Sequence, residues 1–94
     1  MKTLHLNLYR KYFDAILKGE KVVEYRDITP YWSKRLEGRN YDVIQFRNGY
    51  AKVAPVMIVE YKGMSLDGDR YAIQLGKILE SKNVAWRKRK TKTF

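Results

Sequence analysis

Apolar and polar residues alternate at the start of the chain, where leucine occupies every second position of residues 3–8. This period of two predicts a strand with one buried face, and it places His5 on the opposite, solvent-facing side. From Tyr9 to Leu17 the apolar residues recur at helical spacing instead, and Gly19 stands where a left-handed residue commonly ends a helix. The first segment therefore predicts a strand followed directly by a helix.

The next segment predicts a second strand and a second helix. β-branched and aromatic residues between Lys21 and Asp27 favour the strand. Thr29 followed by Pro30 is typical of a helix start, because a threonine side chain caps free N–H groups and proline fits the first helical position. Gly38 then marks the end of this short helix.

The last part of the chain predicts three further strands, over residues 41–47, from Tyr50 onward through residues 56–61, and over residues 70–79. Two segments have the composition of tight turns: Asn48-Gly49, expected as a two-residue hairpin turn, and Asp67-Gly68-Asp69. Pro55 indicates a strand edge or a bulge, since proline donates no ladder hydrogen bond. Gly76 indicates a bulge or a close backbone approach.

Helices that come early and strands that come late predict an α+β domain. We expect a small β-barrel of about five mostly antiparallel strands, closed or nearly closed because closure removes exposed sheet edges, with two short helices covering it. Residues 1–81 are expected to form this domain, and residues 82–94 to form a basic C-terminal tail.

Composition limits the chemistry that is open to this domain. The 94 residues include no cysteine and one histidine, which excludes disulfides, iron–sulfur clusters and cysteine nucleophiles and makes a multi-histidine zinc site impossible. No apolar run approaches the roughly 20 residues of a membrane helix, and residues 1–13 lack the pattern of a signal peptide. We therefore expect a cytoplasmic protein with no metal, no cofactor and no membrane partner.

Positive charge is concentrated at the C-terminal end. The net charge is +10, and residues 82–94 hold six of the basic residues and no acidic one. Such a cluster favours a nucleic acid, because neutralising phosphates releases condensed counterions. The basic tail consists of Lys82, Arg87, Lys88, Arg89, Lys90 and Lys92, and all but the first are predicted to contact nucleic acid. The alternative is a solvated tail that aids solubility. Trp86, just before these cations, is compatible with either.

The segment from Gly19 to Arg26 carries the most chemistry. On a regular strand Glu24 and Arg26 share a face and would form a structural ion pair, and a bulge after Gly19 would turn Lys21 toward the same side. A charged Lys21 beside Glu24 could hold a phosphate or stabilise negative charge, while Glu24 accepts a proton. These residues are therefore candidates both for ligand binding and for catalysis.

The complete pattern Gly-x-Lys-x-x-Glu-x-Arg, at Gly19, Lys21, Glu24 and Arg26, resembles the motif of the ASCH domain, a branch of the PUA-like superfamily. The helix over residues 12–18, the strand and turn over residues 42–50 and the segment 71–76 also fit the layout of that family. The resemblance covers residues 3–79. It implies a barrel-like sheet with helices over its openings and a cleft lined by the motif.

The resemblance also implies a function, because members of the family are thought to bind RNA or nucleotides and some are enzymes. We therefore expect a domain that binds RNA or a nucleotide in this cleft. The alternative is a metal-independent hydrolase that uses Lys21 and Glu24 to cleave RNA or to deacylate N4-acetylcytidine. The amidohydrolase branch of the family carries threonine where this chain has Glu24. In a third hypothesis, the tail is an arm for a larger assembly and the barrel is an inert platform.

Aromatic and basic side chains near the motif complete the expected ligand site. Tyr9 and Tyr50 begin an element and end a turn, so their rings are candidates to stack on bases, whereas Trp32 is expected to pack in the core. The amide of Asn48 can read a base edge. The expected ligand-binding residues are Tyr9, Arg10, Lys21, Glu24, Arg26, Arg47, Asn48 and Tyr50.

Overall fold

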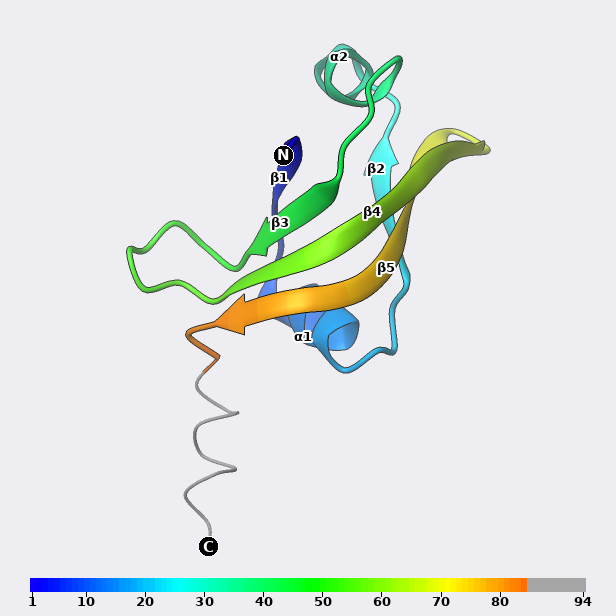
Figure 1. The fold of residues 1–94 in the computed structure, drawn as a ribbon. Coiled ribbons are helices and arrows are strands. Elements are labelled where there is room, and N and C mark those ends of the chain that lie inside the picture. The colour runs from blue at the N-terminus through cyan, green and yellow to red at the C-terminus, as the bar shows by residue number, and fades with distance from the viewer. Residues whose placement is uncertain (85–94) are drawn as a thin grey trace, which may run out of the picture.

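The order of helices and strands is the one expected from the sequence (Figure 1). The structure, a computed structural model, describes residues 1–84. Their elements are β1 (Thr3–Asn7), α1 (Arg10–Leu17), β2 (Val23–Asp27), α2 (Pro30–Leu36), β3 (Val43–Arg47), β4 (Val56–Asp67) and β5 (Arg70–Lys82). Trp86 and the tail cations from Arg87 to Lys92 lie outside the described residues.

The strands of this described part form one sheet in the order β1-β3-β4-β5-β2. Only the β1–β3 pair is parallel, and the other three pairs are antiparallel. The sheet curls into a half-barrel, with α1 and α2 at opposite ends of the curl (Figure 1). The expected α+β class, the five mostly antiparallel strands and the two covering helices are confirmed. The barrel is open, and β1 and β2 are its two edges.

The core fills the inside of this curl, as the alternation along the sequence predicts. The leucines of β1 point inward, while His5 lies on the exposed side. Each helix contributes its apolar stripe: Phe13 and Ile16 from α1, and Leu36 from α2, are all buried. Burying a large apolar side chain contributes about 1.5–3 kcal/mol, so these contacts attach both helices to the sheet. Trp32 is partly buried against the same core, as expected.

The helix boundaries follow the local signals in the sequence. Gly19 has a φ of +80°, the left-handed conformation expected just after α1. Thr29 caps α2, because its Oγ1 accepts a hydrogen bond from the backbone N–H of Trp32 at 3.2 Å, and Pro30 is the first helical residue. Both predicted helix ends are confirmed.

A hydrogen-bonded cluster fixes α2 to the sheet. The hydroxyl of Tyr71 on β5 donates to the carboxylate of Glu37, and the hydroxyl of Ser33 lies 2.5 Å from the Tyr71 oxygen. The hydrogen bond to Glu37 raises the pKa of Tyr71. Because Tyr71 is fully buried, this cluster holds the second helix over one end of the half-barrel.

β3 and β4 pair as an antiparallel hairpin, but the predicted two-residue turn at Asn48-Gly49 is wrong. β3 ends at Arg47, the return strand β4 begins only at Val56, and residues 48–55 form a longer loop. The physical reason is that these turn residues bind the neighbouring β1 end instead of each other. The side-chain amide of Asn48 donates to the backbone carbonyl of Leu8, so the chain cannot fold straight back. The strand expected from Tyr50 therefore starts six positions later, just after Pro55.

The second hairpin and its irregularities agree with the sequence. β4 and β5 meet at a tight turn through Gly68, whose φ is +64°. The pairing of β4 with β5 is irregular around Gly76, where a Cβ atom would stand 2.7 Å from the carboxylate of Glu60, so the bulge and the close approach are both present. β5 continues past the expected end to Lys82, and Val84 is buried in the core.

Candidate ligand-binding cleft

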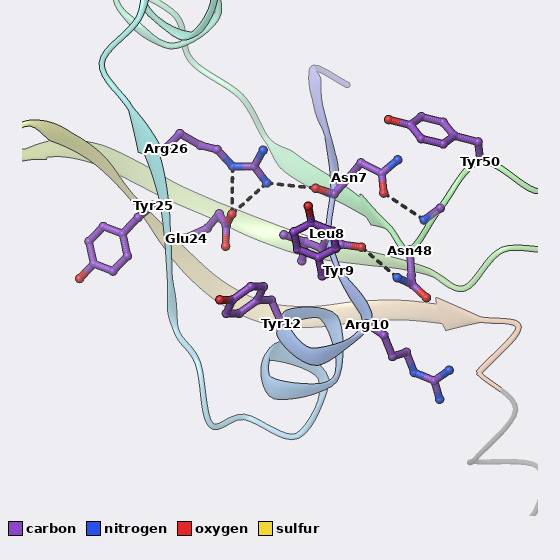
Figure 2. Close-up of a pocket in the computed structure, with 11 residues that line it drawn as sticks. Asn7, Leu8, Tyr9, Arg10, Tyr12, Glu24, Tyr25, Arg26, Asn48 and Tyr50 are labelled. Atoms are coloured by element: carbon purple, nitrogen blue, oxygen red, sulfur yellow. Dashed lines mark hydrogen bonds and ion pairs between the residues drawn. The ribbon is translucent and has the colours of Figure 1, made fainter.

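A cleft of about 660 Å³ opens between the end of β1, the start of α1, β2 and the loop 48–55 (Figure 2). This size lies within the range of about 300–1,000 Å³ that is common for small-molecule sites. Its lining residues are Asn7, Leu8, Tyr9, Arg10, Tyr12, Glu24, Tyr25, Arg26, Asn48, Gly49 and Tyr50. The cleft lies beside the gap between β1 and β2, the two edges of the half-barrel.

The backbone after α1 brings Lys21 toward this cleft. The N–H groups of Glu20 and Lys21 both donate to the carbonyl of Ala15, at 2.9 and 3.1 Å, so the chain is still turning at Lys21. β2 begins at Val23, two residues later than expected, and Lys21 does not follow the alternation of the strand. The turn, rather than a bulge in the strand, places the Lys21 Nζ atom 3.4 Å from Glu24 Oε1.

Glu24 is the only buried charged residue among those described, with 6% of its surface exposed. Its second oxygen, Oε2, accepts a hydrogen bond from Nε of Arg26 at 2.9 Å and forms an ion pair with Nη2 of the same guanidinium, also at 2.9 Å. Each carboxylate oxygen of Glu24 therefore faces a cation. Such pairing offsets the free-energy cost of burying a charged carboxylate. Two cations around one anion leave a net charge of +1 on this group.

Arg26 also connects the two edges of the sheet. Its Nη2 atom donates to the backbone carbonyl of Asn7 on β1, at 3.2 Å, although Arg26 itself belongs to β2 (Figure 2). The guanidinium lies 4.9 Å from the ring centre of Trp32, which supports it from the side of α2. Its Nη1 atom makes no hydrogen bond with residues 1–84. Arg26 is thus both a structural link across the open barrel and a potential donor to a ligand.

Exposed tyrosine rings surround the charged group. Tyr9 and Tyr50 are 81% and 89% exposed, so the expectation that both are accessible is confirmed. Tyr12 and Tyr25 also line the cleft, at 43% and 38% exposure, and the Lys21 ammonium lies 5.8 and 5.6 Å from the centres of their rings. Four tyrosines therefore offer flat surfaces beside a net positive charge.

The far wall of the cleft is the loop 48–55, held by hydrogen bonds to the end of β1. The Asn48 amide donates to the carbonyl of Leu8 at 2.9 Å, and the N–H of Gly49 donates to Oδ1 of Asn7 at 3.0 Å (Figure 2). The Asn48 oxygen makes no hydrogen bond with the described residues. One amide oxygen is therefore available to a ligand in an otherwise fixed loop.

Six of the eight expected ligand-binding residues line this one cleft: Tyr9, Arg10, Glu24, Arg26, Asn48 and Tyr50. The side chain of Arg10 pairs with Asp14 at 3.0 Å and points away from Glu24 (Figure 2). Lys21 lines an adjoining hollow of about 320 Å³, whose wall includes Glu24. Arg47 faces a third hollow and donates to the carbonyls of Gly49 and Ala51.

The expected ligand-binding residues did not include five others that line the cleft: Asn7, Leu8, Tyr12, Tyr25 and Gly49. Tyr12 carried a usable signal, because it stands three positions after Tyr9 and so lies on the same side of a helix. Alternation along β2 places Tyr25 on the face opposite Glu24. It still reaches the cleft wall at the open edge of the sheet, where both sides of β2 border accessible space.

Comparison of the chain with protein-family models, with curated proteins and with solved structures finds no match in any of the three. Within residues 1–84, no helix is both long and apolar enough to cross a membrane. The same residues contain no group of three or more histidine, aspartate or glutamate side chains arranged to hold a metal ion. The candidate site is therefore defined by its geometry alone.

Proposed function

We propose that this cleft binds RNA or a nucleotide and that the chain is a PUA-like domain of the ASCH type. The observation that carries the proposal is the convergence of Tyr9, Asn48 and Tyr50 on the cleft that contains the Glu24–Arg26 pair. The chemistry of these residues marks them in the sequence as candidates, and together with Glu24 and Arg26 they come from three separate segments of the chain. The curled sheet and the position of the motif at its open edge are compatible with the family layout.

The chemistry of the lining suits a nucleotide. Exposed tyrosine rings stack on bases, and each such stack contributes about 1–3 kcal/mol. The unused oxygen of Asn48 can accept a hydrogen bond from a base edge. Nη1 of Arg26 and the ammonium of Lys21 can bind a phosphate oxygen, since the charged group carries a net +1.

Removing either exposed ring should weaken binding without harming the fold. Tyr9→Ala and Tyr50→Ala should each reduce the affinity for a short single-stranded RNA by about fivefold to 150-fold, the loss of one stacking contact. Isothermal titration measures the affinity and a thermal melt checks the fold. Val53→Ala is the control, because Val53 is 74% exposed on the same loop but does not line the cleft. Unchanged affinity in both tyrosine variants would contradict the proposal.

A second candidate function, hydrolysis of RNA or of N4-acetylcytidine, is favoured by one observation. Glu24 lines both the cleft and the adjoining hollow, and its Oε1 lies 3.4 Å from the Lys21 ammonium. In this mechanism Glu24 accepts the proton of the 2′-hydroxyl, or of an attacking water, and Lys21 stabilises the negative charge that develops. The double pairing of Glu24 with two cations makes simple binding the better supported function.

If the domain is a hydrolase, Glu24→Gln should lower turnover by about 10²–10⁴, because glutamine keeps the shape but cannot accept the proton. The assay compares wild type with the variant on single-stranded RNA and on N4-acetylcytidine, with a chelator present. Lys21→Ala is a second variant that leaves the Glu24–Arg26 pair in place. Circular dichroism establishes that each variant is folded. A wild-type protein that leaves both substrates unchanged would eliminate these two activities.

A further inference from the structure

A hollow of about 280 Å³ adjoins the cleft on the other side of Asn7 and Tyr50, which line both. The parallel register of β1 and β3 builds its floor, since it pairs His5 with Gln45 and Asn7 with Arg47. These side chains lie on the face opposite the buried leucines of β1. Tyr31 and Trp32 of α2 complete the wall.

Two hydrogen-bonding side chains that line this hollow have no partner within the described part of the chain. The side chains of His5 and Gln45 make no hydrogen bond with residues 1–84, although Gln45 is half-buried. An amide offers one acceptor and two donors, and an imidazole offers a donor or an acceptor on each nitrogen, so together they can read a base edge.

Aromatic and basic groups surround this polar pair. The ring of Tyr31 is 54% exposed, with the Arg35 guanidinium 3.5 Å from its centre. Tyr50, on the border with the cleft, is almost fully exposed. No acidic residue within 1–84 lines the hollow. The surroundings therefore suit a planar, electron-rich group attached to a phosphate.

We infer that the hollow holds the second base of a single-stranded RNA whose first nucleotide occupies the cleft. This inference rests on the proposed function. The volume of the cleft lies within the range of about 300–1,000 Å³ that is common for sites of whole small ligands. The volume of the hollow, about 280 Å³, is just below this range and suits a single base. Tyr50 lies between the two sites, so its ring can stack on either base. The preferred ligand is thus at least a dinucleotide, and Gln45 with His5 selects the second base.

The test compares AMP and UMP with the dinucleotides pApA and pUpU by isothermal titration on the full chain. The better dinucleotide should bind about tenfold more tightly than its mononucleotide, the effect of one added stack. Tyr31→Ala should remove most of that gain, and Gln45→Ala should reduce dinucleotide affinity about threefold to tenfold. Neither variant should change mononucleotide binding.

Gln74→Ala is the matched control, because Gln74 is also a half-buried glutamine on a strand but lines none of the three hollows described above. It should leave the affinity for both ligand sizes unchanged. Dinucleotides that bind no more tightly than mononucleotides, or variants that weaken both sizes equally, would overturn the second-base site and leave the cleft proposal standing. If no ligand of either size binds, the proposed function itself fails.

Discussion

Replacing Arg26 with alanine should lower the free energy of unfolding by about 3 kcal/mol, because it leaves the buried carboxylate of Glu24 with one cation instead of two. The estimate is at the low end for buried pairs, since 18% of the Arg26 side chain is exposed. The substitution also removes the hydrogen bond from β2 to the Asn7 carbonyl on β1. A loss of this size lowers the melting temperature of a domain this small by more than about 10 °C.

Arg10→Ala is the matched control, because Arg10 also pairs with a carboxylate at 3.0 Å but half of its side chain is exposed. Exposed pairs of this spacing contribute about 0.3–0.5 kcal/mol, so its melting temperature should barely change. Adding Glu24→Gln to Arg26→Ala should recover part of the loss, since the buried side chain that has lost one of its two cations then carries no charge. An Arg26→Ala protein as stable as wild type would show that Arg26 serves the ligand and not the fold.

Neutralising the tail should produce the largest change in the salt dependence of RNA binding. Each phosphate neutralised on a single strand contributes about 0.7 to the slope of log affinity against log salt. Replacing the five tail cations by glutamine should therefore flatten that slope by up to about 3.5. The substituted residues are Arg87, Lys88, Arg89, Lys90 and Lys92. Fluorescence anisotropy with a labelled RNA at several salt concentrations measures the slope.

Substitution is preferable to truncation at residue 81, because Val84 is 5% exposed and belongs to the core. Truncation there would mix a packing defect with the loss of charge. An unchanged slope would place the electrostatic contacts on residues 1–84. If the neutral tail abolishes all binding and Tyr9→Ala has no effect on the wild-type chain, the third hypothesis holds, in which the tail is the arm and the domain a platform.

The sequence predicts well those elements whose formation depends on residues within the same short segment of the chain. The period of two in β1 and the helical spacing in α1 each reflect a face that must be buried against one core. Gly19 and the Thr29-Pro30 pair determine where a helix ends or begins through the backbone conformation and hydrogen bonds of residues close to them in the sequence. Their roles can therefore be predicted without knowing the fold. The same holds for the turn at Gly68.

The errors arise where a contact between distant segments decides the structure. Asn48-Gly49 has ideal turn chemistry, yet its amide and N–H groups bind Leu8 and Asn7, forty or more positions away. Those partners could not be known from the local pattern. In contrast, the grouping of Glu24 with Arg26 was expected because alternation on a strand requires it.

In the candidate site too, features that depend on neighbouring residues were predicted, and features that depend on contacts between distant segments were not. The motif predicted which charges would meet, but the turn that brings Lys21 beside Glu24 depends on the end of α1 accepting two hydrogen bonds at Ala15. Arg47 was expected in the cleft. It faces the neighbouring hollow, because the longer loop takes two hydrogen bonds from its guanidinium. The bridge from Arg26 to β1 follows from the open barrel and has no signature in the sequence.

The most direct test of the cleft is a titration of the ¹⁵N-labelled protein with a short single-stranded RNA, followed by NMR. The tail-neutralised variant is used in parallel, so that contacts of the tail are separated from contacts of the cleft. We predict that the largest amide shifts fall on residues 7–10, 24–26 and 48–50 in both proteins. Shifts confined to the tail, or no shifts in the tail-neutralised variant at millimolar RNA, would contradict the proposal that this cleft is the RNA-binding site.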